Sequence, residues 1–378
     1  MTRKERLMAT MRGEPVDRPP VCFYEINGLD EDPQDENPFN IYSHPSWAPL
    51  LKLAREKTDR IVMRGLPFQM TETSELEKRT TRHSYFDENG SLHTIKEIRA
   101  DGRILREHTR RDRDVNTVWT IEHLLKDEAD LEAWIQLPEE EAGPPDYTAI
   151  IEAERELGDS GIVMLDTSDA LCRIASLFGM EDYTVIALTE PELFHRALAK
   201  AHRELRSRVE QVARELPGRL WRIYGPEYAT PPYLPPKLYE EYVVRYDREL
   251  VAAIQTNGGF TRIHQHGNLK DVLDYVVQTG CLGLDPIEPA PQGDVTLAYV
   301  REKYGKQLVL FGNLEVNDIE LLAPDEFEKK VVTAIREGTS GEGRGFVLLP
   351  SAAPYGRILS SVAFGNYERM IEVVEGIY

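Results

Sequence analysis

Cysteines and long apolar runs are scarce in this sequence. The 378 residues include only three cysteines, Cys22, Cys172 and Cys281, which lie far apart and form no CxxC motif. This usage predicts a reducing compartment without disulfides and excludes a thiolate cluster that sequence spacing would reveal. No run of about 18 apolar residues and no signal-peptide core occurs, so we expect a cytoplasmic protein that does not enter membranes.

Positive charge is scarce as well. The chain has 45 Lys and Arg residues against 65 Asp and Glu residues, which gives a formal net charge of −20. Such a surface repels nucleic acids and anionic membranes, so we expect a small-molecule substrate rather than a polyanionic partner. A glycine-rich phosphate turn is missing too, because the segment after Glu25 reads INGLDEDPQDEN. This argues against a doubly wound nucleotide-binding fold.

Short β-rich runs, in contrast, recur along the whole chain. Between the later runs the hydrophobic period becomes helical, with caps such as Asn268 before LKDVLDYVVQT, which stops at Gly280. Eight apolar strands alternating with helices predict an α/β fold, a (β/α)₈ TIM barrel formed by residues 1–378 as a single domain. The predicted strands are residues 20–25, 59–65, 161–167, 219–225, 260–266, 281–287, 307–313 and 345–351.

One stretch, residues 71–121, interrupts the alternation of strands and helices. It carries two turn signals, Asn89-Gly90 and Asp101-Gly102, flanked by alternating segments such as SLHTIKEI and RILREHT. These features are typical of hairpins. We therefore predict a β-hairpin insertion between the second and third barrel strands.

Chemistry in a barrel sits at the carboxyl ends of the strands. His264 and His266 are two residues apart on a predicted strand, so both imidazoles project to one side and can chelate one metal ion. A third ligand is needed, and Glu227 and Glu288 are the best placed. Alternatively, the two histidines hydrogen-bond a substrate carboxylate or each other. The strand ends nominate ten residues: Glu25, Arg64, Asp166, Glu227, His264, His266, Asp285, Glu288, Asn313 and Ser351.

The other candidates each have a plain structural alternative. Glu227 and Glu288 are metal ligands or general bases, or else carboxylates exposed at helix N-termini. Asp166 takes part in catalysis or caps the next helix. Tyr355 and Arg357 follow the eighth strand, where Arg357 clamps a substrate carboxylate or pairs with a surface acid.

Several segments together resemble the uroporphyrinogen decarboxylase superfamily, which also contains corrinoid-linked methyltransferases. They are RKERLMATMRGEPVDRPPV, GPEYATPPYLPPKLYEEYV, IHQHGNLKDVLDYVVQTGCLGLDPIEP and FGNLE, and they extend over nearly the whole chain. The resemblance implies a (β/α)₈ barrel and commonly a homodimer.

Two departures separate this chain from the branches of that superfamily. The porphyrinogen decarboxylases carry an arginine-rich segment after the first strand, whereas this chain has no arginine between Arg18 and Arg55 and is acidic there. A polycarboxylate substrate would be repelled. The methyltransferase branch has a zinc site of His-x-Cys plus a later cysteine. Here those positions read His264-Gln265-His266 and Ser351-Ala352-Ala353, a nitrogen and oxygen set without sulfur.

The resemblance and these departures imply methyl transfer or demethylation of a small methylated oxygen or nitrogen compound, with a corrinoid partner protein. In this interpretation His264, His266 and Glu288 bind a divalent metal, zinc before other ions. Glu227 completes the site or moves protons, Asp166 assists, and Tyr355 and Arg357 position the substrate. The alternatives are a decarboxylase of a small acid or of uroporphyrinogen, with Arg64 or Arg357 as the anion clamp, and a non-catalytic ligand-binding barrel.

Overall fold

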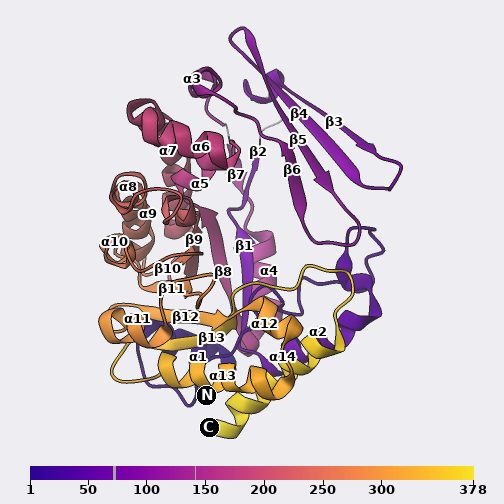
Figure 1. Ribbon diagram of the computed structural model, residues 1–378, viewed down its shortest axis with the longest axis vertical. Helices are drawn as coiled ribbons and strands as arrows, with labels where there is room; N and C mark the ends of the chain where they lie inside the picture. Colours follow the sequence, from indigo (N-terminus) through magenta and orange to yellow (C-terminus); the bar gives the residue numbers. More distant parts are fainter. Residues whose placement is uncertain (71–73, 141) are drawn as a thin grey trace.

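The centre of the molecule is a curled sheet of seven parallel strands. The computed structural model describes residues 1–70, 74–140 and 142–378. Each strand pairs with the next in a regular parallel register, so the sheet follows chain order and curls through the body of the molecule (Figure 1). The strands in spatial order are β1 (Arg60–Gly65), β8 (Gly161–Ser168), β9 (Leu220–Tyr224), β10 (Phe260–Gln265), β11 (Gly283–Pro286), β12 (Val309–Leu314) and β13 (Phe346–Pro350).

The predicted first strand, residues 20–25, is reduced to a short bridging segment. The Cys22 N–H donates to Leu348 O in β13 at 2.9 Å, and the Asp59 N–H, just before β1, donates to Val21 O at 2.7 Å. The segment thus touches both edges of the seven-stranded sheet. It ends early because the backbone turns at Tyr24, where φ is +53°. The described residues form a seven-stranded sheet with a bridging segment, and the eight-stranded barrel remains a prediction.

Apolar side chains fill both faces of this sheet. Inside the curl, Leu7 and Met11 from α1 (Arg3–Arg12) pack with Ile61, Ile162 and Leu220 near the starts of three strands. Helix α1 begins with a capping box between Thr2 and Glu5. It therefore closes the amino-terminal end of the curl, and the carboxyl ends of the strands are left for polar groups.

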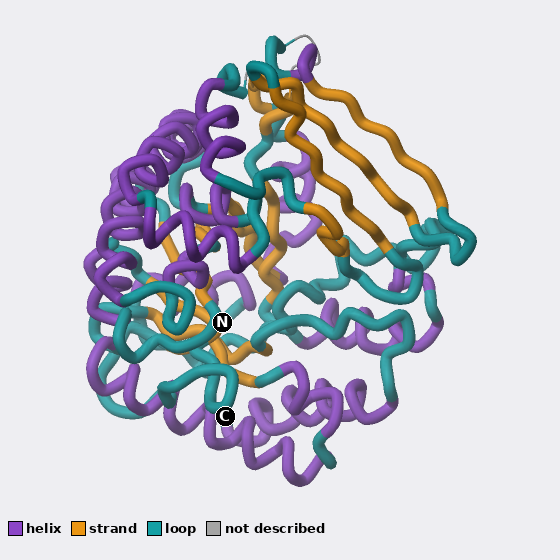
Figure 2. Tube along the Cα trace, turned by 45° about the horizontal axis from the view of Figure 1, so that its top comes forward, coloured by secondary structure: helices purple, strands orange, loops and turns teal. Residues whose placement is uncertain are grey.

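A second, larger core lies between the sheet and the helices, which cover its outer face (Figure 2). The longest helix in the described residues is α7 (Pro191–Glu215), whose proline at the first turn and strongly amphipathic sequence suit a helix lying on a sheet. The helices after α1 are α2 (Ala48–Lys57), α3 (Glu128–Gln136), α4 (Thr148–Leu157), α5 (Ala170–Ala175), α6 (Met180–Thr189), α7 (Pro191–Glu215), α8 (Pro236–Tyr239), α9 (Arg245–Thr256), α10 (Leu273–Gln278), α11 (Leu297–Tyr304), α12 (Val316–Leu321), α13 (Pro324–Gly338) and α14 (Ser361–Ile377).

A separate antiparallel sheet is inserted between β1 and β8 and stands beside the main body (Figures 1 and 2). It has four strands in chain order, β3 (Thr80–Phe86), β4 (Leu92–Ala100), β5 (Arg103–Arg111) and β6 (Val118–Glu122). Gly90 and Gly102 turn the chain between the first three strands with φ of +77° and +83°. A two-stranded ladder, β2 (Phe68–Met70) with β7 (Ala142–Pro145), links this region to the body. The first predicted insertion residues, 71–73, lie outside the described residues.

None of the helices in the described ranges combines the length and the apolar character that crossing a membrane would require.

Candidate active site at the carboxyl edge of the sheet

Two histidine–carboxylate pairs lie side by side where β10 and β11 end. His264 and Asp285 are register partners, and His264 Nδ1 is hydrogen-bonded to Asp285 Oδ2 at 2.7 Å. His266 Nδ1 is hydrogen-bonded to Glu288 Oε1 at 2.8 Å, and Glu288 Oε2 accepts from the Gly267 N–H at 2.9 Å. The two imidazole centroids are 4.7 Å apart with an interplanar angle of 88°. The structure thus brings together the predicted His264, His266 and Glu288.

The backbone after β11 explains why Glu288 reaches back to β10. Ile287 is fully buried and adopts φ of +55°, a conformation that a β-branched residue rarely takes. The turn directs the next residue toward the end of the neighbouring strand. Such strain persists only where the surroundings hold it, and it is common at functional sites.

A charged layer of inward-facing side chains lies beneath the histidines. Arg222 on β9 donates two hydrogen bonds to Asp166 on β8, at 2.6 and 3.0 Å, and a third to Tyr24 Oη at 2.5 Å. Tyr24 Oη lies 3.4 Å from His264 Nε2. Asp166, predicted from its strand end, is therefore held bidentately by Arg222 rather than capping a helix, and this pair is connected to His264 through Tyr24.

Tyr24 and Arg222 were missed by sequence reasoning. Both lie on the inward-facing register, two residues after the buried Cys22 and Leu220 respectively, and alternation along a strand is the signal that would have found them. The sequence pattern did not nominate Arg222, because an arginine inside a strand interrupts the apolar run by which the strand is recognised.

The charges around the histidines shift several pKa values. Burial raises the pKa of Asp285, but the charges of Arg262 and His264 outweigh burial and lower it to about 2. Arg262 Nε lies 3.1 Å from Asp285 Oδ1. Burial lowers the pKa of His266, but its bond to Glu288 and the charges of Glu288 and Glu227 together raise it above its ordinary value. The arrangement keeps the carboxylates ionised and favours a protonated His266.

Glu315, directly after β12, is a further titratable group at this edge. It is 6% exposed and accepts a hydrogen bond from the Ser351 hydroxyl at 3.3 Å, while its Oε1 is buried without a partner among the described residues. Burial, and then the charge of Glu288, raise its pKa to about 7. A carboxyl with this pKa can hold or release a proton near neutral pH. Glu315 lies two residues past Asn313, the strand end that the sequence nominated.

The remaining predicted residues lie in different surroundings. Glu227 follows β9, where its Oε2 accepts from the Gly225 N–H at 3.1 Å, and its charge acts on His266. Arg357 donates to backbone carbonyls of Pro38, Asn40 and Arg113, and Tyr355 is 56% exposed. Among the described residues neither Tyr355 nor Arg357 is hydrogen-bonded to the histidine–carboxylate pairs. Arg357 instead ties the last loop to residues 38–43 and to the end of β5.

The predicted metal site does not form as a three-ligand cluster. Across residues 1–70, 74–140 and 142–378, no group of three or more His, Cys, Asp or Glu side chains is arranged to hold a metal ion. The Nδ1 atoms of both histidines are engaged by carboxylates, and both Glu288 oxygens accept hydrogen bonds. A carboxylate on Nδ1 is also the usual partner of a metal-binding imidazole, so ligation of an ion by His264, His266 and Glu288 stays a prediction.

Comparison with known proteins identifies the family of this chain. The family model described as Uroporphyrinogen decarboxylase (URO-D) matches residues 121–377. The chain belongs to the uroporphyrinogen decarboxylase (URO-D) family, and this membership indicates an enzyme. No curated protein sequence matches the chain.

Among solved structures, a methyltransferase from Methanosarcina mazei is similar with a TM-score of 0.59 and 16% identity, covering 100% of this chain and 99% of that one. The shared fold therefore includes the residues that precede the family match. A D-psicose 3-epimerase from Clostridium cellulolyticum matches 62% of this chain and 91% of its own length, with 12% identity and a TM-score of 0.31. An AP endonuclease from Brucella melitensis matches 56% of this chain and 81% of its own length, with 14% identity and a TM-score of 0.31.

Proposed function

We propose that this protein moves a methyl group between a small methylated oxygen or nitrogen compound and a corrinoid carried by a partner protein. The observation that carries this proposal is the pair of hydrogen-bonded dyads, His264 with Asp285 and His266 with Glu288, at the carboxyl edge of the sheet. The fold similarity to a methyltransferase over the whole chain supports it. We further propose a homodimer and an eight-stranded barrel in which residues 20–25 act as the first strand.

The chemistry of such a transfer needs a proton at the right place. When a methyl group is transferred from an ether oxygen or from the nitrogen of a neutral amine, the bonding electron pair stays on that atom, and the resulting alkoxide or amide anion must be protonated. The corrinoid, when bound, supplies the centre that accepts the methyl group. His266 is suited to give the proton because Glu288 orients its ring and raises its pKa. Glu315, with a pKa of about 7, is suited to return the proton to His266.

The charges at the edge favour a neutral or cationic substrate over an acid. The charges of Glu227 and Glu288 act on His266, and the charge of Glu288 also acts on Glu315. Both arginines predicted as anion clamps are engaged elsewhere, because Arg64 Nη2 is 2.8 Å from Asp30 Oδ1 and Arg357 is held by carbonyls. A methylated amine or ether therefore fits better than the carboxylic acid of a decarboxylase.

The test is a transfer assay with purified protein, reduced cobalamin as the corrinoid, and a panel of methylamines and methoxy compounds as donors. Formation of methylcobalamin is followed by absorbance. We expect turnover with at least one donor and a loss of about a hundredfold or more in His266→Ala, the range for removing a proton-transfer group. His83→Ala, which changes an exposed histidine on β3, is the matched control.

Unchanged turnover in His266→Ala, with circular dichroism showing a native fold, rejects the role of this dyad. Elemental analysis of the same preparation tests the metal prediction independently. Stoichiometric zinc that His264→Ala and His266→Ala both release would show that the two imidazoles bind an ion.

A further inference from the structure

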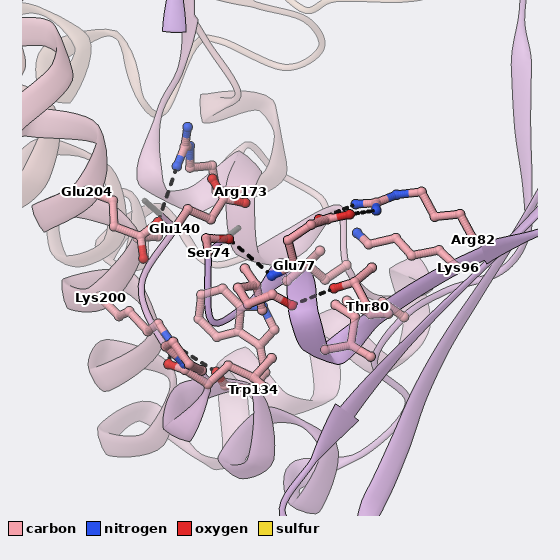
Figure 3. A pocket seen from close by; sticks show the side chains of 17 residues that line it. Ser74, Glu77, Thr80, Arg82, Lys96, Trp134, Glu140, Arg173, Lys200 and Glu204 are labelled. Carbon is pink, nitrogen blue, oxygen red and sulfur yellow. Dashed lines mark hydrogen bonds and ion pairs between the residues drawn. The ribbon is translucent and has the colours of Figure 1, made fainter. Parts of the chain in front are cut away.

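A cavity of about 240 Å³ lies away from the histidine dyads, between the antiparallel sheet and the helices of the body. Its walls come from the chain just before β3, from β3 and β4, and from α3, α5 and α7 (Figure 3). We call it the sheet–helix cavity and define it by Lys96, Leu124, Trp134, Arg173, Lys200 and Glu204. None of its described lining residues belongs to the dyads or to the charged layer beneath them.

Part of the wall is apolar and rigid. Ile98, Leu124, Leu137 and Ala201 line the cavity and are each at most 6% exposed. Trp134 adds an aromatic surface and is held by Lys200, whose ammonium lies 4.8 Å from the ring centroid. A small cavity with a fixed apolar wall and a few polar groups is the usual form of a small-molecule site.

Most charged groups around the cavity are already partnered. Glu77 pairs with Arg82, and Glu140 pairs with Arg208. Lys200 Nζ donates to the carbonyls of Trp134 and Ile135 at 3.1 Å each, and also to that of Leu137. These groups stabilise the walls and leave little capacity for a ligand.

Two cations remain underused, and they lie on opposite walls (Figure 3). The side-chain ammonium of Lys96 on β4 makes no hydrogen bond or ion pair with any described residue. Arg173 on α5 makes only a 3.8 Å ion pair with Glu204, whose side chain is 8% exposed. The lining holds four cations against three carboxylates, in a chain whose net charge is −20. A concave site with surplus positive charge concentrates anions.

We propose that the sheet–helix cavity binds a small organic carboxylate with an apolar body. The carboxylate pairs with the Lys96 ammonium or the Arg173 guanidinium, and the body packs on Trp134 and the leucines. Both cations are partly exposed, and an anion reaches the Lys96 ammonium without displacing an ion pair, whereas at Arg173 it competes with the long contact to Glu204. The site is independent of the methyl-transfer proposal, because its test measures binding rather than turnover.

The test is calorimetric titration of the full chain with benzoate, and with benzamide as a neutral molecule of the same shape. We expect benzoate to bind at least about tenfold more tightly than benzamide, because only the anion pairs with a cation. Lys96→Met or Arg173→Met should weaken the binding of benzoate by about tenfold. Lys52→Met, which removes an equal charge from an exposed site on α2, should leave benzoate binding unchanged.

Absence of benzoate binding, equal affinity for benzamide, or full affinity retained in both Lys96→Met and Arg173→Met would each overturn the proposal. Ala201→Leu, which adds volume from α7 into the cavity, should abolish binding and locates the site. Lys96→Met decides the matter if the leucine variant does not fold, because Lys96 has no partner to lose.

Discussion

Two regions of this protein hold paired histidines, and the pKa of an imidazole is shifted in opposite directions in the two regions. At the carboxyl edge of the parallel sheet, His264 and His266 each bind a carboxylate, and the pKa of His266 is raised. On the antiparallel sheet, His93 Nδ1 and His108 Nε2 bind each other at 2.8 Å. Burial and the charges of His93 and Arg106 lower the pKa of His108. Neighbouring charge, rather than pairing itself, sets whether an imidazole carries a proton.

The two sheets differ in burial as much as in charge. Strands β10 and β13 are buried along almost their whole length, whereas β3 is exposed from its second residue to its last. Residues 80–122 carry eight basic and eight acidic residues, so the net charge of −20 comes entirely from the rest of the chain. The parallel sheet is specified by apolar burial, and the antiparallel sheet by turns and cross-strand pairs.

The largest effect that this comparison predicts is at Asp285, which is fully buried between Arg262 and His264. Asp285→Asn removes the negative charge that pairs with the buried guanidinium of Arg262, so we expect the free energy of unfolding to fall by about 3–5 kcal/mol. Chemical denaturation measures this. Asp87→Asn, which changes the half-exposed carboxylate beside His93, is the control and should leave the midpoint unchanged. Equal effects at the two sites would remove the distinction between the sheets.

A smaller effect is expected at Glu315, and it depends on pH. The folded protein holds a proton on this carboxyl up to about pH 7, whereas the ordinary pKa is 4.5. Stability from the protonated form is therefore complete below pH 4.5 and is lost as the pH rises through 7. Glu315→Gln removes this loss of stability. We therefore expect the free energy of unfolding of the variant to exceed that of the parent by about 1–2 kcal/mol at pH 8 and to equal it at pH 4.

Denaturant unfolding at both pH values tests this, with Glu326→Gln on the exposed face of α13 as the control. A difference that stays constant between the two pH values would show that the raised pKa does not contribute to stability.

The elements that burial specifies were predictable from the sequence. Residues 260–266 were expected to form a strand that places two histidines on one side, and β10 covers Phe260–Gln265. The turn signals at Asn89-Gly90 and Asp101-Gly102 likewise correspond to turns in the antiparallel sheet. Such elements follow from local patterns of apolar residues and of turn-forming residues.

Features that depend on distant neighbours were not predictable. The first strand stops at Tyr24 because of a backbone conformation that tyrosine does not signal. Arg357 donates to carbonyls near residue 40, more than 300 positions earlier in the chain. Its guanidinium is therefore held away from the strand ends, where it was predicted to bind substrate. The pKa of Glu315 depends on Ser351 and Glu288, which belong to neighbouring strand ends. Sequence spacing does not report any of these contacts.

The smallest predicted effect is at His108, and it sharpens the contrast between the histidine pairs. Because the pKa of His108 is lowered below 6.5 in the folded state, its contribution to the stability of the fold is present above pH 6.5 and is lost as the pH falls. We expect His108→Gln to cost less than about 1 kcal/mol at pH 8, as for other partly exposed polar pairs, and nothing measurable at pH 5. Thermal melts at the two pH values test this, with His83→Gln on the neighbouring strand β3 as the control. A larger cost at pH 5 than at pH 8 would mean that the antiparallel sheet stabilises a charged imidazole, as Glu288 does for His266. The two histidine pairs would then not differ in the sign of their pKa shifts.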